Sequence, residues 1–458
     1  MENFTPVDEI VKTRKGAPSI VFEGFTFRKD HVDQARNLMF WRCRHKGCPG
    51  RLVSDPTMKW AKVTKPHQGH LPNKKIRDAA KVMERMKERV VKEKVPVNRI
   101  YREETRAVAN DAETLDLIPP FAKMKSAFYK SRKLTFGPVP SSLEEFAVPD
   151  ALKTLESGES FLLFQGGGNR IVVFGTEKDF CAVCTAQELF VDGTFDAVPA
   201  FFAQLFTIHT FNGRKQFPRL YCFLADKKAE TYTRLITALK NLAAAKGLVF
   251  APPKITSDFE SGWLSAVGES LMTTSIHGCF FHFTQAIIRK ITTLGMMKKN
   301  KDDDVFRNIV RQVVGLAFLP SNKVFETLGL IIRSNNDEQT KRFLDYVMSQ
   351  WIIHVQPEVW NVKGRVHRTN NDLESWHNRL NIDVGKAKNV FFIIQCLVND
   401  HIDATVLERQ LENGEVVTSG KRKDEAKNKT IAFLEEELAR GKKTELEFCL
   451  AVGSLMVK

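Results

Sequence analysis

The 458-residue chain lacks the apolar run of roughly 20 residues that a membrane-spanning helix needs. Its N-terminus has neither the basic region nor the apolar region of a secretory signal peptide. Cysteine is sparse, with 8 residues, and in a long chain without an export signal we expect thiols or metal ligands rather than disulfides. We therefore expect a protein of the cytosol or nucleus that does not act at a membrane.

Positive charge, in contrast, is abundant and concentrated. The formal net charge is +15, and residues 36–99 hold 18 Lys and Arg against 5 Asp and Glu, so that 18 − 5 = +13 of the excess lies in about one seventh of the chain. Such a concentration is typical of a module that faces nucleic acid and is attached to a nearly neutral body. The chain is long enough for several domains with substantial cores.

Residues 17–72 combine short strand-like segments with candidate metal ligands. A hairpin that turns at Gly24 and two further strands are predicted, and the pairs Cys43-x4-Cys48 and His67-x2-His70 are threaded through them. Two thiolates and two imidazoles suit tetrahedral Zn²⁺, which supplies folding energy to a module too small to build its own core. The sequence therefore predicts a structural zinc site, against the alternative of a loop with incidental Cys and His.

These residues resemble a FLYWCH-type zinc finger. The resemblance rests on Gly24, Phe25 and Phe27 in the hairpin, on Trp41 shortly before the first cysteine, on Arg51, and on the two ligand pairs, although the family more often has His-x-His. It implies a small β-rich domain that binds DNA or protein. The basic rim would contact the phosphates of double-stranded DNA; its candidate residues are Arg42, Arg44, Lys46 and Arg51.

Residues 73–150 are predicted to form a basic helical bridge followed by a proline-containing linker. Apolar residues at three- and four-residue steps predict an amphipathic helix over 74–94, and two more helices are expected at 97–110 and 119–129. Two interpretations stay open: a helix-turn-helix-like arrangement beside DNA, or a solvated basic helix that links two domains. The candidate DNA contacts on the first helix are Lys75, Arg77, Lys81 and Arg85.

Residues 151–400 form the predicted body, in which the elements from 186 onward follow the order βββαβαβ. This is the order of a ribonuclease-H-like fold, whose first and fourth strands are neighbours. Asp192, in a strand expected to end at Gly193, would then meet Asp258 at one edge of the sheet. Two carboxylates held close repel each other unless a divalent metal neutralises them. The alternative for Asp192 alone is a strand followed by an Asp-Gly turn.

Residues 368–380 supply a candidate third carboxylate. Helical spacing places Glu374 on one face and Trp376 on another, so Glu374 could point at metals while Trp376 anchors the helix to the sheet. An isolated helical Glu is by default a solvated surface residue. His209 and His377 lie near these motifs, and each could contact DNA or be structural.

From about 188 to 390 the body resembles the Mutator-like element (MULE) transposase domain. The matching segments are Asp192-Gly-Thr-Phe195, Thr256-Ser-Asp-Phe-Glu260, Gly278-Cys-Phe-Phe-His-Phe283 and Arg368-Thr-Asn-Asn-Asp-Leu-Glu-Ser-Trp-His-Asn-Arg-Leu380. The resemblance implies that Asp192, Asp258 and Glu374 are a catalytic triad. It also implies that Cys279 and His282 are the family's Cys-x2-His motif, and that residues 290–365 are a helical insertion.

The implied chemistry uses two Mg²⁺ or Mn²⁺ ions about 3.5–4 Å apart. Asp192 would bridge both ions, and Asp258 and Glu374 would each complete the shell of one. Water would attack a phosphodiester to free an element end, and the resulting 3′-hydroxyl would attack target DNA. Hard cations fit because they prefer oxygen ligands.

The remaining segments carry weaker signals. Residues 401–458 are predicted to be helical, as a solvated tail or a small cap. Cys181-x2-Cys184 has zinc-like spacing but no second pair nearby. Basic runs at 74–81 and 421–423 permit nuclear import.

The sequence as a whole predicts an α+β multidomain protein: a β-rich zinc finger, a helical bridge, and a ribonuclease-H-like α/β domain interrupted by a helical insertion. The expected function is that of a nuclear DNA transposase that acts on terminal inverted repeats, with homo-oligomerisation as an option. The rival is a domesticated, transposase-derived regulator of transcription that binds DNA without catalysis.

Overall fold

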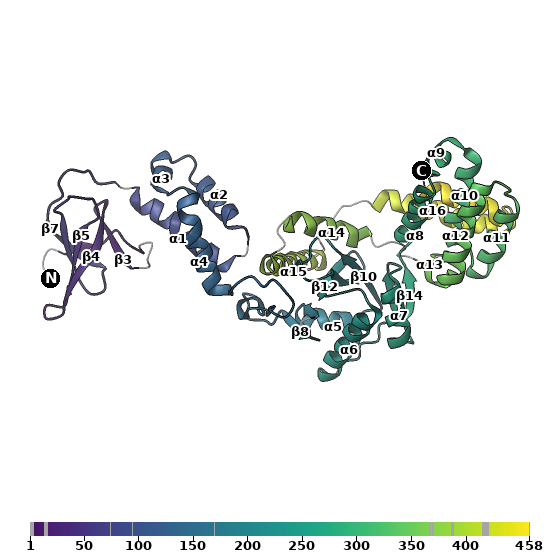
Figure 1. The fold of residues 1–458 in the computed structure, drawn as a ribbon, viewed down its shortest axis with the longest axis horizontal. Coiled ribbons are helices and arrows are strands. Elements are labelled where there is room, and N and C mark those ends of the chain that lie inside the picture. The colour runs from purple at the N-terminus through teal and green to yellow at the C-terminus, as the bar shows by residue number, and fades with distance from the viewer. Residues whose placement is uncertain are drawn as a thin grey trace. The chain divides into compact units, whose positions relative to one another are not determined.

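The computed structural model describes residues 4–12, 17–73, 75–93, 95–168, 170–365, 368, 371–385, 389–414 and 421–457. The chain divides into two compact units, Met1–Val139 and Pro140–Lys458 (Figure 1). The first has a β-rich sheet with a Cys/His cluster, and the second has another sheet and most of the helices. The protein is therefore of the α+β class.

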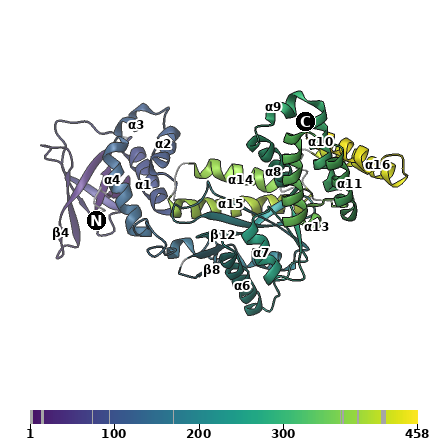
Figure 2. The same ribbon diagram turned by 45° about the vertical axis from the view of Figure 1, so that its right-hand side comes forward.

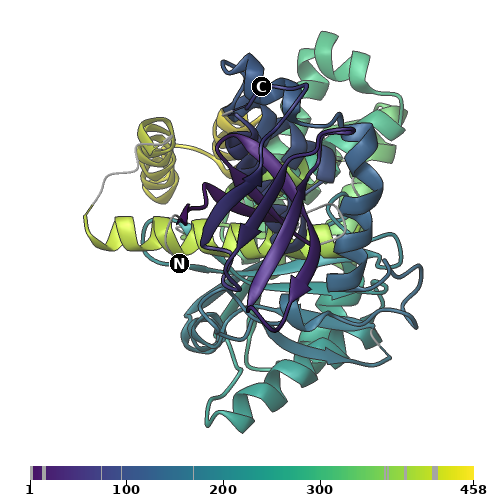
Figure 3. The same ribbon diagram turned by 90° about the vertical axis from the view of Figure 1, so that its left-hand side faces the viewer.

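The sheet of the first unit contains seven strands among the described residues, in the order β1-β7-β6-β5-β4-β3-β2, and faces the viewer in Figure 3. All neighbours pair antiparallel. Trp41 is fully buried in the core, and its Nε1 donates a hydrogen bond to Ser54 Oγ at 2.8 Å. The predicted hairpin is confirmed, because Glu23 and Gly24 turn with φ values of 49° and 73°. The strands are β1 (Thr5–Pro6), β2 (Glu9–Lys12), β3 (Pro18–Phe22), β4 (Phe25–Asp33), β5 (Leu38–Cys43), β6 (Arg51–Ser54) and β7 (Trp60–Lys65).

Helices α1 (Ile76–Lys92), α2 (Val97–Ala107), α3 (Ala112–Leu117) and α4 (Phe121–Phe136) follow the sheet. They share one apolar core to which all four contribute or pack, with Met86, Ile100 and Phe128 among its most buried members. The segment is thus a packed helical bundle, and a solvated linker helix does not describe α1. The short helix α3 was not predicted, and α4 runs seven residues beyond the predicted end at 129.

The sheet of the second unit has the order β14-β13-β10-β11-β12-β9-β8. Strands β10, β13 and β14 pair parallel, and the other neighbours pair antiparallel. The order β10, β11, β12, α6, β13, α7, β14 confirms the predicted succession βββαβαβ, and the pairing of β10 with β13 confirms that the first and fourth strands are neighbours. The elements are β8 (Leu162–Gly166), β9 (Ile171–Phe174), α5 (Glu177–Thr185), β10 (Glu188–Thr194), β11 (Gln204–Phe211), β12 (Gln216–Leu224), α6 (Ala229–Ala245), β13 (Lys254–Ser257), α7 (Ser261–Ser270) and β14 (Ser275–Gly278).

Helices cover both faces of this sheet (Figure 2). One face packs against α6 and α7 through a core that includes Val191, Leu235 and Trp263. Helices α14 (Asn371–Val384) and α15 (Val390–Glu412) lie over the other face. Trp376 on α14 contacts the rings of His209 and Tyr221 from that face, which confirms its predicted anchoring role.

By its length and composition alone, helix α15 could cross a membrane, which the apolar runs of the sequence did not predict. More than half of its apolar window, 56%, is buried within the protein, as in the core helix of a soluble fold. Its buried Asp400 accepts hydrogen bonds from Tyr221 Oη at 2.7 Å, from Trp376 Nε1 at 2.8 Å and from Arg379. Buried Glu408 pairs with Arg219 of β12. These polar contacts tie α15 to the sheet and α14 to α15.

The remaining helices form a separate apolar core. The C-terminal segment belongs to it, with Phe448 and Val452 fully buried, so a solvated tail is the wrong description. Helices α10 and α17 approach closely, because a Cβ at Gly315 would lie 2.1 Å from the carbonyl oxygen of Cys449. The helices are α8 (Phe280–Thr293), α9 (Met297–Asp302), α10 (Asp304–Gly315), α11 (Ser321–Arg333), α12 (Glu338–Met348), α13 (Pro357–Trp360), α16 (Lys421–Ala439) and α17 (Glu445–Met456).

Replacement of Asp400 by alanine should destabilise the second unit. The change leaves the Trp376 and Tyr221 donors and the Arg379 guanidinium without their shared acceptor, and breaking such a buried network costs about 3 kcal/mol. Asp403→Ala, on the exposed side of the same helix, should change the free energy of unfolding by less than about 0.5 kcal/mol. Calorimetry of the two variants checks this, and equal losses would contradict the role given to Asp400.

Candidate functional site

The four predicted zinc ligands come together in the first unit. Cys43 Sγ lies 3.4 Å from His70 Nε2, Cys48 Sγ lies 3.4 Å from His67 Nδ1, and the two ligand nitrogens are 3.3 Å apart. With Zn–S and Zn–N bonds of about 2.3 and 2.0 Å, the edges of a tetrahedral site are about 3.5 Å long. The cluster therefore fits structural Zn²⁺, and the wider His-x2-His spacing is compatible with ligation through Nδ1 of one ring and Nε2 of the other.

The hairpin residues that carry the family resemblance support this cluster. The Phe25 ring stacks on His67 at 3.6 Å between centroids, and Phe27 meets the same imidazole edge-on. Backbone amides of His45 and Gly50 donate to Cys43 Sγ and Cys48 Sγ at 3.4 and 3.3 Å, which favours the thiolate forms that bind metal. Aromatic packing fixes the ring plane of His67, and the amides fix both sulfur atoms.

The structure places the eight predicted DNA-binding residues in different electrostatic settings. Four of them are engaged by carboxylates: Arg42 by Asp30, Lys75 by Asp111, Arg77 by Glu9 and Arg85 by Glu104. Lys81 lies 3.8 Å from Glu9. Arg51 donates to the carbonyl oxygens of Pro49 and Gly50. Arg44 and Lys46 are exposed. Spacing along the sequence could not reveal these partners, because most of them lie on other elements.

Two predicted acidic residues meet on the sheet of the second unit. Parallel register pairs Glu188 with Lys254 and Phe190 with Thr256, and the same offset places Asp192 level with Asp258, which directly follows β13. Strand β10 continues to Thr194 rather than ending at Gly193. Gly193 faces the side chain of Gln204 on the next strand: a Cβ there would lie 2.4 Å from Gln204 Oε1, so that side chain would have to shift.

The electrostatics of these carboxylates reflect their burial. Burial, followed by the charge of Asp258, raises the pKa of Asp192 to about 8. Burial also raises the pKa of Asp258 and raises that of Glu374, on α14, to about 7. The charge of Glu374 contributes to the shift of Asp192, so α14 brings the third acidic residue into range of the first. Glu374 Oε1 is buried and has no hydrogen-bond partner among the described residues.

Two imidazoles flank the acidic residues. His377 Nδ1 lies 3.6 Å from Asp192 Oδ2, and His282 Nε2 lies 3.8 Å from Glu374 Oε1. Burial, with a smaller effect of His282, lowers the pKa of His377 to about 4, and burial also lowers the pKa of His282. The spacing of Glu374 and His377, three residues apart on one helix, is the signal that would have marked His377 as part of this site.

Other predicted positions have structural settings. His209 is buried, contacts Thr207 Oγ1 at 3.1 Å and packs against Trp376, so its structural alternative holds. Cys279 is buried at the start of α8, where its amide donates to the Ser257 carbonyl at 2.7 Å. Thr369 and Asn370 of the third motif lie outside the described residues.

Glu260, the last residue of the segment that begins at Thr256, has no predicted role but lies near the acidic residues. Glu260 accepts a hydrogen bond from Tyr232 Oη at 2.6 Å and lies 3.6 Å from Lys227 Nζ. Its charge contributes to the raised pKa of Asp192, and its own pKa is raised by burial and by the charge of Asp258. It is therefore a fourth carboxylate near the site, and the Asp-x-Glu spacing was the signal for it.

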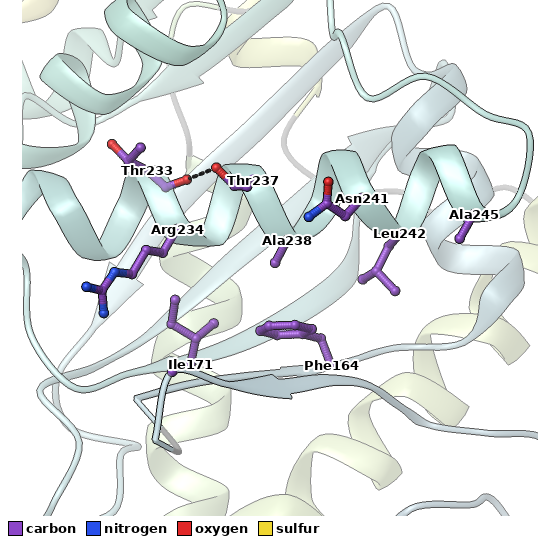
Figure 4. Close-up of a pocket in the computed structure, with 10 residues that line it drawn as sticks. Phe164, Ile171, Thr233, Arg234, Thr237, Ala238, Asn241, Leu242 and Ala245 are labelled. Carbon is purple, nitrogen blue, oxygen red and sulfur yellow. Dashed lines mark hydrogen bonds between the residues drawn. The ribbon is translucent and has the colours of Figure 1, made fainter.

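Neither an apolar groove nor the Cys181–Cys184 pair adds to this site. The groove lies between α6 and the β8–β9 edge (Figure 4), and none of the predicted site residues lines it. Burial raises the pKa of Cys184 to about 11, which disfavours the metal-binding thiolate. Among the described residues, the finger cluster is the group of Cys, His, Asp and Glu whose ligand atoms lie within 4.8 Å of one another; the acidic residues of the second unit are more widely spaced.

Comparison with protein families gives two matches. Residues 10–70 match the FLYWCH zinc finger domain and residues 188–286 match the MULE transposase domain. The class defined by these features is a transposase-related, DNA-binding zinc-finger protein. The chain has the architecture of a MULE transposase with an N-terminal FLYWCH zinc finger. The second match contains Asp192, Asp258, Cys279 and His282, whereas Glu374 lies beyond it. No curated protein shows a significant match to the chain.

Substitution of Gly50 should weaken zinc binding without removing a ligand. An added Cβ would lie 2.8 Å from His67 Nδ1 and 3.3 Å from Cys48 Sγ, so Gly50→Ala must displace a ligand. We expect zinc affinity to fall by about 10- to 100-fold, the effect typical of disturbed support around a metal. Competition with a chromophoric chelator measures this. Lys46→Ala, in the same exposed loop, is the control, and an unchanged affinity of Gly50→Ala would show that Nδ1 is not the ligand atom.

Proposed function

We propose that this protein is a DNA transposase of the MULE type. Its site for cutting and joining DNA phosphodiesters would be formed by Asp192, Asp258 and Glu374. The observation that carries the proposal is the level placement of Asp192 and Asp258 on paired parallel strands, with Glu374 brought to them by α14. The finger and its basic rim would hold double-stranded DNA, with terminal inverted repeats as the expected target. A nuclear location belongs to the same proposal.

A ribonuclease-H-like fold for the second unit is part of this proposal. The succession β14-β13-β10-β11-β12 gives the order 5-4-1-2-3, with the first three strands antiparallel and the last two parallel to the first. Strands β9 and β8 extend the sheet beyond β12. In this arrangement the first and fourth strands deliver their carboxylates to one place, which supports the assignment of Asp192 and Asp258 as partners.

The donor set of the site suits hard divalent cations. The carboxylates are buried or half-buried and repel one another, and buried Glu374 Oε1 has no hydrogen-bond partner among the described residues. Oxygen donors of this kind favour Mg²⁺ or Mn²⁺. Asp192 would contact both ions, and Asp258 and Glu374 would hold one each. Bound in this way, a metal pair would supply activation of the attacking oxygen and stabilisation of the leaving oxygen.

The residues of the chain itself fix the carboxylates. The amide of Gly193 donates to Asp192 Oδ1 at 2.9 Å, and the amide of Glu260 donates to Asp258 Oδ1 at 3.2 Å. The position of Glu374 depends on α14, which Trp376 and Arg379 attach to Asp400. The protein thus holds each acidic group by a separate contact, which supports a role for pre-arranged ligands.

Substitution of the acidic residues should abolish DNA cleavage. In Mg²⁺ or Mn²⁺, cleavage of DNA that carries cognate terminal repeats is expected to fall at least about a thousandfold in Asp192→Asn and Glu374→Gln, because each removes a metal-binding charge. Asp383→Asn, an exposed carboxylate on α14, should keep wild-type activity. Gel-resolved cleavage of labelled DNA measures all three.

The outcomes separate the proposal from its rival. Undiminished cleavage by Asp192→Asn or Glu374→Gln would refute the site. Wild-type protein that binds the same DNA tightly and does not cut it with either metal would instead indicate a DNA-binding regulator. Binding assays on the variants show whether the fold is retained.

The raised pKa of Asp192 predicts a pH-dependent stability. Because its folded pKa of about 8 exceeds the unfolded value of about 3.9, the stability linked to its proton is present at low pH and is lost as the pH rises through 8. Asp192→Asn removes this loss. Without Mg²⁺ or Mn²⁺ at pH 8, the variant should unfold about 5 °C above wild type, and the difference should shrink toward pH 5.

Calorimetry of the zinc-loaded protein checks this expectation. Added Mn²⁺ should stabilise wild type and leave Asp192→Asn nearly unchanged, since the variant lacks one ligand charge. Asp383→Asn should behave as wild type at every pH. A variant that is no more stable than wild type at pH 8 would contradict the buried charge.

A further inference from the structure

We propose that α4 is the helix of the first unit's bundle that lies against duplex DNA. The inference rests on the proposed function for its partner, double-stranded DNA. It moves the DNA contact from α1, where the sequence analysis predicted it, to a helix whose four lysines have no ion-pair partner in the described part of the chain.

The exposed face of α4 is basic and unpaired. The helix contains five Lys or Arg and no Asp or Glu. Its four lysines are exposed, and no ion pair joins them to a carboxylate among the described residues. Tyr129, 49% exposed, lies in the middle of the same face. Helical periodicity groups most of the exposed side chains on one side of α4; they are Ala122, Lys123, Lys125, Ser126, Tyr129, Lys130 and Lys133. Leu134 and Thr135, near the end of the helix, are also exposed.

The arginines of α1, in contrast, already have carboxylate partners, whereas Lys87 and Lys92 have none among the described residues. Arg85 and Arg89 both pair with Glu104, which is buried between α1 and α2, and Arg89 also pairs with Glu93 and Glu103. Lys75 and Arg77 pair with carboxylates on other segments. A phosphate approaching this helix would meet those carboxylates and would have to displace them. Most of the charge of α1 is therefore paired, whereas the four lysines of α4 are available.

The bundle presents α4 rigidly. Helices α3 and α4 are joined by the short turn Ile118–Pro119–Pro120. Helix, turn, helix is the order in which DNA-binding proteins of this kind place the second helix in a major groove. Tyr101 of α2 holds the start of α4, with its hydroxyl donating to the Pro119 carbonyl at 3.2 Å and its ring 5.5 Å from that of Phe121.

The fifth basic residue, Arg132, serves the bundle rather than the ligand. Its guanidinium donates to the carbonyl oxygens of Val90 and Glu93 at 3.2 and 2.9 Å. Helix α4 is thus fixed on its inner side by Arg132 and the apolar core, and its lysines remain on the outer side for phosphates. Ser126 and Tyr129 lie between the lysines, where they would reach base edges or sugars.

The test compares two variants of the full chain with equal loss of charge. In the first, Lys123, Lys125, Lys130 and Lys133 are all changed to glutamine, which keeps helix propensity. In the second, four exposed lysines of the other unit, which form no ion pair among the described residues, are changed in the same way: Lys178, Lys298, Lys301 and Lys341. Fluorescence anisotropy measures the affinity for a DNA duplex at salt concentrations from 50 to 200 mM, a range over which affinity that depends on phosphate contacts falls steeply.

We expect the α4 variant to bind at least about tenfold more weakly than wild type. The plot of log binding constant against log salt concentration should also become less steep by about 3 to 4, because each lost phosphate contact lowers the magnitude of its slope by about 0.9. The second variant should stay within about twofold of wild type. Equal losses in the two variants, or no loss in the α4 variant, would overturn the inference. Zinc content and circular dichroism show that finger and bundle remain folded, and Lys→Arg at the four positions should restore binding.

The experiment also separates this inference from the function on which it rests. If the wild-type chain does not bind duplex DNA at all, the proposed function fails together with α4. If it binds and the α4 variant binds equally well, only α4 is excluded, and the finger carries the DNA. The inactive Asp192→Asn protein should show the same dependence on the α4 lysines as wild type, since α4 acts in binding and not in the reaction.

Discussion

The second unit depends on the parallel register between β10 and β13. This pairing joins residues 66 positions apart, as in Glu188 with Lys254, and it brings two carboxylates level at a place where burial raises the pKa of both. A shift by one residue would turn one of the two side chains to the opposite face of the sheet. The apolar packing of Val191 and Ile255 against α6 and α7 resists such a shift, so the core that stabilises the sheet also sets the acidic pair.

The third carboxylate depends on a different device. Helix α14 has no strand register to fix it, and its attachment comes from Trp376 and Arg379, which share the buried acceptor Asp400 on α15. Tyr221 of β12 donates to the same carboxylate. One buried acidic residue thus links a sheet strand and two helices.

The predictable features of this protein are those that local spacing or element order determines. The zinc ligands followed from two residue pairs, and the meeting of Asp192 with Asp258 followed from the strand order. The predicted role of Trp376 followed from helical periodicity. Features that depend on partners distant in the sequence were not predictable. Pairing of Arg77 with Glu9 and of Arg85 with Glu104 is set by packing, and no charge count reveals it.

The same reason explains the remaining differences. The approach of α10 to α17 requires a backbone contact at Gly315 that no pattern in 401–458 announces. Gly193 resembled a turn residue, but its constraint comes from Gln204 on the neighbouring strand. Local propensity identifies an element, whereas contacts between elements decide whether a charge is free or paired and whether a helix is a tail or part of a core.

Charge compensation at the acidic site leads to one more step. The imidazoles of His377 and His282 lie near the carboxylates, and as cations they would neutralise them. Burial, however, lowers the pKa of both rings, that of His377 to about 4, so near neutral pH they carry no charge. The compensating charge must then come from protons on the carboxylates or from bound cations. If the site binds divalent cations as proposed, their binding would therefore be coupled to proton release, and the flanking imidazoles would act as neutral neighbours of the carboxylates rather than as counter-ions.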